Sequence, residues 1–343
     1  PKLPAAMDAA ARVRLFLGAV LWLAPSLVGL AAATARSVPT RPGTAAAAPV
    51  APAAPTPARP PATVRKIGRT EYVTATEVAR QLGLKLRWIV PGKKLTLTGP
   101  STKAEIEADT RDITVNGLRV FLGDPAADAG GQIYLSRVDF ERCLTPLLRP
   151  GFGVPARPAP KTIVLDAGHG GNDPGKINSK LKINEKTFTL DVAVRTRKLL
   201  EAAGYRVVLT RSDDRSVALS RRAAAANLAR ADAFVSIHFN ALANDTKTSG
   251  VEVYTFAPRF QRSANAWGPM EKNDTENEAS PVNRFDHWSA LLAHAIHGRY
   301  VEDLKAADRG KKLMHLAVLR PLNCPGVLIE CGFLTSDAEA RKI

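Results

Sequence analysis

The stretch KTIVLDAGHGG, residues 161–171, decides how the larger part of this chain folds. Thr162 to Asp166 is a short apolar run that predicts a buried strand, and the glycine-rich segment after it predicts a turn. The glycines at 168, 170 and 171 do not form the G-x-G-x-x-G pattern of dinucleotide-binding folds, and no phosphate-binding lysine follows as in a P-loop. The turn instead presents His169 at the carboxyl end of the strand.

Strands and helices alternate downstream of this turn. Asn184 is expected to cap the first helix, and Gly204 is expected to end it. Further strands are expected at 206–210, 233–237, 250–256, 316–319 and 327–330, with helices at 184–203, 219–230 and 289–304. This pattern predicts an α/β domain of three layers, in which helices flank a largely parallel sheet. Sites in such sheets form at the carboxyl ends of the strands.

Four ionisable side chains are expected to meet at that edge of the sheet. His169 follows the first strand, His238 follows the strand at 233–237, Glu185 begins the first helix, and Glu330 ends the last strand. Two imidazoles and a carboxylate are good ligands for a catalytic zinc ion. Zinc lowers the pKa of a bound water from ~15.7 toward ~7. A separate carboxylate then acts as general base and proton carrier.

Each of these residues, taken alone, has a structural explanation. A glutamate in the first turn of a helix usually interacts with the helix dipole, whereas Glu330 ends an apolar strand without a local partner, which is costly. His287, His294 and His297 fall at i, i+7 and i+10 on one helix face and form a rival metal site. Because no carboxylate converges on them, we interpret them as a polar helix face.

Several motifs, in order along the chain, resemble the zinc-dependent N-acetylmuramoyl-L-alanine amidases of the type-3 cell-wall hydrolase family. They are DAGHGG at 166–171, DPG at 173–175, NEK at 184–186, LSRR at 219–222 with AN at 226–227, SIHFNA at 236–241, GVEVY at 250–254 and PGVLIECGFL at 325–334. The resemblance covers nearly all of 161–343. It implies hydrolysis of the amide between the muramic acid lactyl group and L-alanine of peptidoglycan.

The resemblance also assigns roles to the four residues. His169, Glu185 and His238 match the ligands of one zinc ion per chain, and Glu330 matches the catalytic glutamate. The alternative is a latent or catalytically inactive peptidoglycan-binding protein on the same fold. The presence of all four residues favours the enzyme.

The N-terminal segment predicts export. Residues 7–35 have a basic start, an apolar run from Leu15 to Ala33 and small residues at a cleavage spacing, which is typical of a secretory signal peptide. An uncleaved anchor is the alternative, because about 19 apolar residues can span a bilayer; this segment would then be the only membrane contact. Residues 36–63 predict a semi-extended Ala/Pro-rich linker. We expect a periplasmic or extracellular protein of a bacterium.

Residues 64–148 predict a small α+β domain, followed by a second linker at 149–160. A short strand followed by an amphipathic helix occurs twice, at 71–82 and 132–148, and Asn116-Gly117 predicts a hairpin turn within 112–122. The pattern resembles the small domain named after the copper amine oxidase N-terminus. Because it has no histidine cluster, no copper site is implied, and we interpret it as a binding or spacer module.

Composition excludes two further classes of function. Lys and Arg number 48 against 32 Asp and Glu, a net charge of +16, but the excess is spread along the chain rather than focused on one stripe, so nucleic-acid binding is not expected. The three cysteines do not form a zinc module. Cys324 and Cys331 flank a predicted strand of roughly 23 Å, far beyond the ~7 Å limit for a disulfide.

The chain departs from the family pattern in two places. Residues 257–288 form a polar insertion, and the strand before it is expected to end at Phe256 near His169 and His238. Four acidic residues of the insertion could then reach the zinc and block it: Glu271, Asp274, Glu276 and Glu278. An activator protein acting on 257–288 is the partner expected in that case, and a solvated loop is the alternative. The family's last helix would begin near Asp337, so its copy here is expected to be truncated.

Overall fold

The computed structural model describes residues 64–155, 157–243, 245–266 and 278–343. The predicted signal peptide and the first linker therefore lie outside the described residues, as does the middle of the insertion. No helix in the described ranges is both long and apolar enough to cross a membrane.

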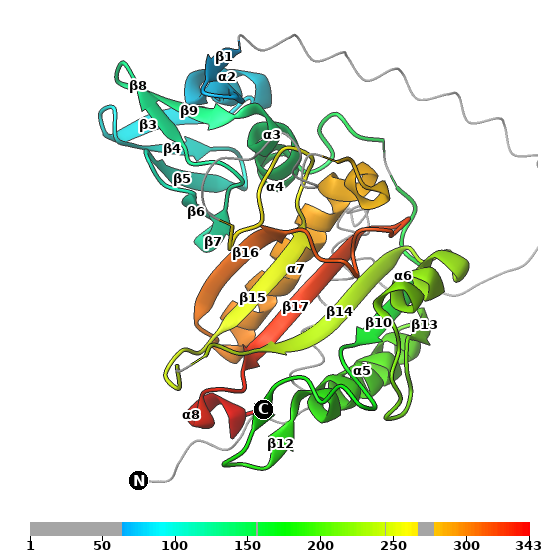
Figure 1. The fold of residues 1–343 in the computed structure, drawn as a ribbon. Coiled ribbons are helices and arrows are strands. Elements are labelled where there is room, and N and C mark those ends of the chain that lie inside the picture. Colours follow the sequence, from blue (N-terminus) through cyan, green and yellow to red (C-terminus); the bar gives the residue numbers. More distant parts are fainter. Residues whose placement is uncertain (1–63, 156, 244, 267–277) are drawn as a thin grey trace, which may run out of the picture.

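One continuous sheet of eleven strands runs through the molecule, in the order β13-β10-β14-β17-β15-β16-β7-β6-β5-β4-β3 (Figure 1). Its strands are β3 (Lys85–Val90), β4 (Lys94–Thr98), β5 (Lys103–Glu107), β6 (Asp112–Val115), β7 (Leu118–Phe121), β10 (Thr162–Ala167), β13 (Arg206–Leu209), β14 (Ala233–Asn240), β15 (Val251–Phe256), β16 (Asp308–Met314) and β17 (Gly326–Phe333). β13, β10, β14 and β17 are parallel, and β15 runs antiparallel to β17. The predicted largely parallel sheet is confirmed for the larger module.

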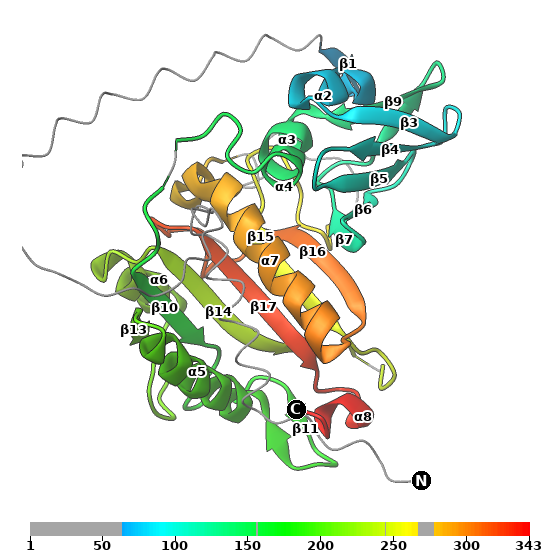
Figure 2. The same ribbon diagram turned by 180° about the vertical axis from the view of Figure 1, so that it is seen from behind.

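Helices cover both faces of this part of the sheet, which gives the predicted three layers. α5 (Glu185–Ala202) and α7 (Asp286–Leu304) pack on one face, against alternate strand residues such as Ile163 and Ile329. α6 (Leu219–Leu228) packs on the other face, against residues such as Val164 and Phe234. Figure 2 shows α7 lying along the sheet. The alternation follows from the two-residue period of a strand.

The strand predicted at 316–319 is wrong. The chain instead forms β16 at Asp308–Met314, and residues 317–321 are a turn after it. Val318 and Leu319 are buried in the same core as α6. The apolar residues at 316–319 are therefore explained by burial in this core. The strand forms earlier in the chain, at β16, where it pairs with β15 and β7.

The N-terminal module has a second, four-stranded sheet of β1 (Arg65–Ile67), β2 (Thr70–Thr74), β9 (Gln132–Ser136) and β8 (Ala127–Ala129). α2 (Ala75–Leu82) follows β2. After β9 the chain is helical as α3 (Arg137–Asp139), a π-helix at Phe140–Leu144 and α4 (Thr145–Leu148). Asn116 and Gly117 have φ of 52° and 82°, as a two-residue hairpin turn between β6 and β7 requires. Both strand–helix units and the hairpin are confirmed.

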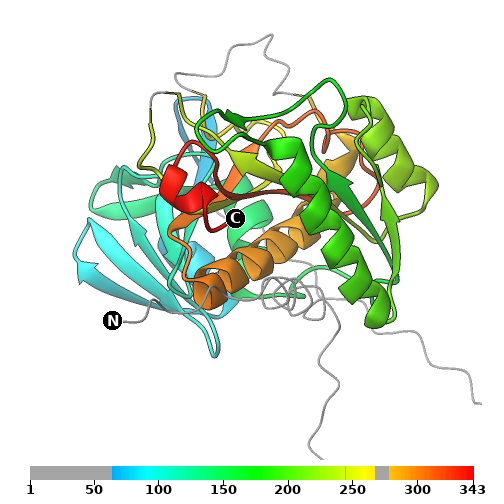
Figure 3. The same ribbon diagram turned by 90° about the horizontal axis from the view of Figure 1, so that it is seen from below.

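The two modules meet edge to edge. β7 pairs in parallel with β16 through Val120 and Lys311, and the backbone N–H of Arg119 donates to Asp308 Oδ2 at 2.9 Å. α4 and the π-helix contact α7. Figure 3 shows the blue and cyan strands of the N-terminal module at one end of the molecule and the lime-green α6 at the other. The division into two domains stays a prediction.

Smaller elements complete the described chain. They are the two-stranded β11 (Ile177–Asn178) and β12 (Ile183–Asn184), a 3-10 helix at Pro281–Phe285, and α8 (Asp337–Ala340). All three cysteines are free, as expected for Cys324 and Cys331.

The insertion leaves the sheet at the opposite edge from the one predicted. Because β15 is antiparallel to β17, Glu252 lies opposite Glu330 and Thr255 lies opposite Val327. Phe256 therefore lies at the edge away from the carboxyl ends of β14 and β17. The prediction that residues 257–288 depart beside His169 and His238 is wrong, since strand direction depends on long-range pairing. Of the four acidic residues that were expected to block zinc, only Glu278 lies among the described residues, and it is exposed.

Candidate metal centre

The loop after β10 holds His169 in an unusual conformation. Its φ is 60°, in the left-handed region that non-glycine residues seldom occupy. On one side of its ring, Nδ1 lies 2.8 Å from Asp173 Oδ2; on the other, Nε2 lies 3.0 Å from Glu185 Oε1. The ring is thus fixed between two carboxylates, and one of them belongs to the first residue of α5.

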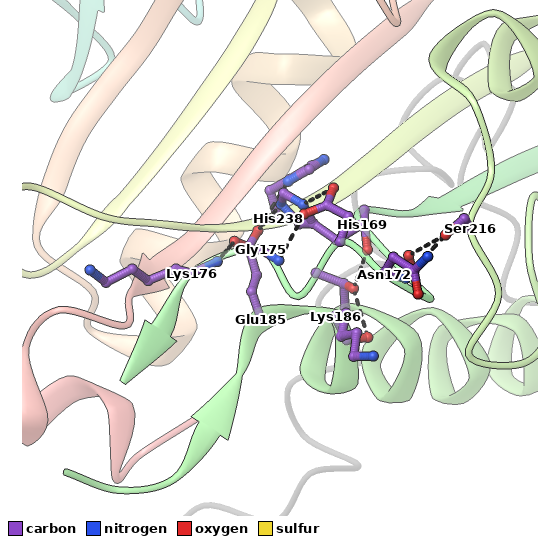
Figure 4. A network of polar contacts seen from close by, with 12 residues as sticks. His169, Asn172, Gly175, Lys176, Glu185, Lys186, Ser216 and His238 are labelled. Atoms are coloured by element: carbon purple, nitrogen blue, oxygen red, sulfur yellow. Dashed lines mark hydrogen bonds and ion pairs between the residues drawn. The ribbon is translucent and has the colours of Figure 1, made fainter. Parts of the chain in front are cut away.

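Glu185 is shared by both histidines. Its Oε1 lies 3.0 Å from His238 Nδ1 on β14 and accepts a hydrogen bond from the backbone N–H of Phe239, while Oε2 accepts one from the N–H of Lys176 at 2.9 Å. The two imidazole rings meet edge to face with centroids 4.8 Å apart. Figure 4 shows the three side chains directed toward one another from β14, α5 and the loop after β10.

Glycines permit this close approach. A Cβ at Gly168 would lie 2.3 Å from Cε1 of His238, and one at Gly175 would lie 2.7 Å from both Glu185 Cβ and His169 Cδ2. Gly175 also has a φ of +65°. The DAGHGG and DPG motifs therefore supply room at the point where the three side chains converge.

Charge interactions at the centre are strong. Burial opposes ionisation of Glu185, which is 4% exposed, but its contacts with His169 and His238 outweigh burial and hold its pKa well below the usual range. For His169, burial lowers the pKa, but contacts with Glu185 and Asp173 outweigh it and raise the pKa. The donor atoms of His169, Glu185 and His238 all lie within 4.8 Å of one another. Two imidazoles and one carboxylate fit a zinc ion.

Glu330 lies on the strand next to His238. It is the register partner of His238 on one side and of Glu252 on β15 on the other. Its Oε2 is buried and has no hydrogen-bond partner among the residues that the structure describes. Burial, followed by the charges of Glu185 and Glu252, raises the pKa of Glu330 well above its ordinary value. The site thus contains an ionised glutamate and a glutamate that favours its protonated form.

Two buried arginines hold the His169 loop from behind. Arg222 of α6 pairs with Asp166 at 2.8 Å and donates to the carbonyl oxygen of His169 at 2.7 Å. Arg211, which is fully buried, donates to the carbonyls of Ala167 at 3.0 Å and Gly168 at 2.8 Å. Sequence reasoning missed both roles. The LSRR motif marked Arg222 only as part of a family pattern, and nothing in the sequence distinguished Arg211 from a surface arginine.

The family comparison agrees with this geometry. Residues 163–343, more than half of the chain, match the model of the family described as N-acetylmuramoyl-L-alanine amidase. The chain belongs to this amidase family.

Relatives of this amidase domain include cell-wall enzymes. The chain is 34% identical over 184 residues to a probable cell wall amidase LytH of Staphylococcus epidermidis, covering 53% of this chain and 51% of the relative. It is 32% identical over 197 residues to the N-acetylmuramoyl-L-alanine amidase AmiC of Neisseria meningitidis serogroup B, covering 53% and 47%. A crystal structure of N-acetylmuramoyl-L-alanine amidase from Clostridium difficile 630 is 33% identical, covers 53% of this chain and 84% of its own, and has a TM-score of 0.42. The chain spans about half the length of these curated relatives.

The histidines of α7 do not form a second centre in the described part of the amidase domain. His297 is fully buried and lies 2.6 Å from Asp308 Oδ1, so the predicted polar face is wrong at this position. Burial lowers the pKa of His287 and of His294 to about 4. This face of α7 packs toward β16 and the N-terminal module, which sequence spacing did not reveal.

The sequence did not single out a further buried glutamate in the amidase domain, which lies beside Glu330. Glu252, of the GVEVY motif, is 3% exposed, and its Oε1 accepts from Arg309 Nε at 2.8 Å and Lys312 Nζ at 2.9 Å. Its Oε2 accepts from Asn240 and from the hydroxyl of Tyr254. Burial raises its pKa, but these donors outweigh burial and lower it. Glu252 is thus held as an anion directly beside Glu330.

Proposed function

We propose that this protein hydrolyses the amide bond between the N-acetylmuramic acid lactyl group and L-alanine in peptidoglycan. The observation that carries the proposal is the convergence of His169, Glu185 and His238, with donor atoms within 4.8 Å, on the strand edge beside Glu330. Membership of the amidase family supports the same bond. The proposed function is therefore that of a cell-wall hydrolase.

His169, Glu185 and His238 would hold one zinc ion. When bound, zinc supplies Lewis-acid chemistry for hydrolysis. Asp173 contacts Nδ1 of His169, which orients the ring and leaves Nε2 directed toward Glu185. Ligand-orienting partners of this kind typically matter almost as much as the ligands themselves. Arg222 fixes the same residue through its carbonyl oxygen.

Glu330 would move the proton. Its Oε2 has no partner among the described residues, so this atom is available to a substrate or to water. A carboxyl group that favours its protonated form can deliver a proton to the departing amine of L-alanine, and its conjugate base can take one from the attacking water. Pairing with His238 in register places Glu330 beside the proposed metal ligands.

We also propose that the protein acts outside the cytoplasm. The predicted signal peptide at 7–35 supports export, and peptidoglycan lies outside the inner membrane. An activator protein acting on 257–288 also remains a prediction; β15, the strand before the insertion, ends at the sheet edge away from His169 and His238.

The test uses the full chain, stripped of metal by a chelator and then supplied with zinc. We expect the zinc-loaded chain to release dye from labelled sacculi, and mass spectrometry of a soluble muropeptide to show separation at the lactyl–L-alanine amide. The metal-stripped chain should release nothing. Cleavage within the glycan or between peptide residues would contradict the proposal. Binding to sacculi without release in the presence of zinc would favour the latent wall-binding alternative.

A further inference from the structure

The catalytic edge continues sideways into the N-terminal module. Register places His238, Glu330 and Glu252 side by side on β14, β17 and β15. Tyr254 pairs with Lys312 on β16, and side chains two residues apart share a face, so Lys312 lies on the same face as Glu252. Figure 1 shows these strands adjacent, with β7 beyond β16.

β7 adds two side chains to this row. Lys312 Nζ lies 5.2 Å from the centroid of the Phe121 ring, and Arg119 Cζ lies 5.1 Å from it. Phe121 fits because Gly310 has no side chain: a Cβ there would lie 2.7 Å from the ring. We call Arg119, Phe121, Arg309 and Lys312 the cationic strip. It combines residues from both modules on the face that holds Glu330.

Each cation of the strip has a carboxylate partner, but two of them share the same one. Arg309 and Lys312 both donate to one oxygen of one carboxylate, Glu252 Oε1, which is buried. These two cations therefore share one buried carboxylate, and the carboxylate of Asp245 also lies near Arg309. Arg119 has its own partner in Asp112, and its side chain is 41% exposed. Arg309 is 32% exposed. The strip thus presents two partly exposed guanidinium groups, those of Arg119 and Arg309, to solvent next to the proposed catalytic centre.

We propose that the cationic strip binds the carboxylates of the peptidoglycan stem peptide, so that the N-terminal module contributes directly to substrate recognition. This inference rests on the proposed function. The scissile amide joins a neutral glycan region to a peptide that carries free carboxylates, and only the peptide complements the charge of the strip. The ring of Phe121 is already in contact with two cations, which favours a carboxylate over a stacked sugar.

The spacing agrees with this assignment. The charged atoms Lys312 Nζ and Arg309 Nε both contact Glu252 Oε1, and Glu252 is the direct register partner of Glu330, one strand spacing or about 5 Å away. An extended peptide advances about 3.3 Å per residue. A stem peptide whose first residue lies at Glu330 therefore reaches the charged groups of Lys312 and Arg309 within about two residues, where its first free carboxylate lies.

The test measures binding without turnover. Two fluorescein-labelled L-Ala-γ-D-Glu-L-Ala peptides, both with a blocked C-terminus, differ only in a free or amidated carboxylate on the second residue. Fluorescence anisotropy with the metal-stripped full chain should give about tenfold tighter binding of the free carboxylate, the gain from one charge-assisted contact. Lys312→Met and Arg119→Gln should each reduce that preference. Lys198→Met, an exposed lysine of α5, serves as the matched control and should keep it.

Equal affinity for the two peptides, or an unchanged preference in both variants, would overturn the inference. If the Lys312→Met chain shows no thermal unfolding transition, it is not folded, and the carboxylate preference of the Arg119→Gln chain, whose substituted side chain is more exposed, decides the test. Hydrolysis is measured separately on a muropeptide with zinc. If the chain hydrolyses the expected amide but shows no carboxylate preference, only the proposed role of the cationic strip is overturned. If it shows the preference but no hydrolysis, the amidase function is overturned and the strip remains a peptide-binding surface.

Discussion

The carboxyl edge of β10, β14 and β17 and the junction of β16 with the N-terminal module both bury ionisable side chains, but they arrange them differently. At the edge, His169 and His238 both contact one oxygen of Glu185. At the junction, ionisable groups meet in separate pairs: His297 with Asp308 at 2.6 Å, and Lys311 with Cys143 at 3.8 Å.

Burial perturbs titration in both regions, so perturbation alone does not identify a site. Burial raises the pKa of Asp286 at the junction to about 7 and lowers that of His294 to about 4. At the edge the ionisable groups also act on one another. Convergence of donor atoms, more than a shifted pKa, distinguishes a candidate centre from a buried polar packing.

The largest expected effect separates the histidines of the two regions. His238→Ala should abolish stoichiometric zinc binding and hydrolysis, because two remaining protein ligands do not complete the site. His169→Ala should do the same. His294→Ala, at the junction, should retain zinc. Zinc content after gel filtration measures all three, and full occupancy in His169→Ala and His238→Ala would refute the ligand assignment.

A second prediction compares two buried acids whose pKa is raised. Glu330→Gln should keep zinc but lose at least ~10²-fold in hydrolysis rate, the usual minimum contribution of a general acid–base group. Asp286→Asn has a similarly buried carboxyl but lies at the junction, and it should remain active. Release of dye from sacculi and zinc content are measured together. An active Glu330→Gln chain would make Glu330 a structural residue.

The third prediction concerns the pH dependence of stability at the junction. The pKa of Asp286 is raised on folding, so its contribution to stability is complete below about pH 4 and is lost as pH rises through about 7. Asp286→Asn cannot ionise and lacks this loss. The free energy of unfolding in urea, wild type minus variant, should fall by up to about 4 kcal/mol between pH 4 and pH 8. A difference that does not vary with pH would show that Asp286 ionises normally in the folded chain.

The smallest effect is expected from the buried lysine. Lys311 is 1% exposed, and its hydrogen bond goes to a sulfur atom, so its ammonium group is poorly compensated. Lys311→Met keeps a similar volume without the charge, and should raise the free energy of unfolding by about 1 kcal/mol while zinc content stays the same. A loss of stability would instead show that Lys311 holds the junction together.

Sequence predicted the site better than its surroundings. His169, His238 and Glu330 were expected to follow or end apolar strands, with Glu185 at the start of a helix, and the rule for parallel sheets brought them together. In the structure β14 continues to Asn240 and β17 to Phe333, so His238 and Glu330 lie within their strands rather than after or at the end of them. The direction of β15 could not be predicted, because it depends on pairing between distant segments. The burial of Arg211 and His297 could not be predicted either, because each is compensated by a group from a different element: the carbonyl oxygen of Ala167 on β10 and the carboxylate of Asp308 on β16.

The pairing of β7 with β16 has a consequence for the solubility of the amidase domain. A chain beginning at residue 161 would leave β16 as an open edge, with the N–H and C=O groups that now face β7 free to recruit a strand from another molecule. Lys311, which is now buried in the junction, would become solvent-exposed. Gly310, which now packs against the ring of Phe121, would also become exposed. The hairpin of β6 and β7 therefore covers this strand edge, and a chain that begins at residue 161 should self-associate more readily than the longer chain.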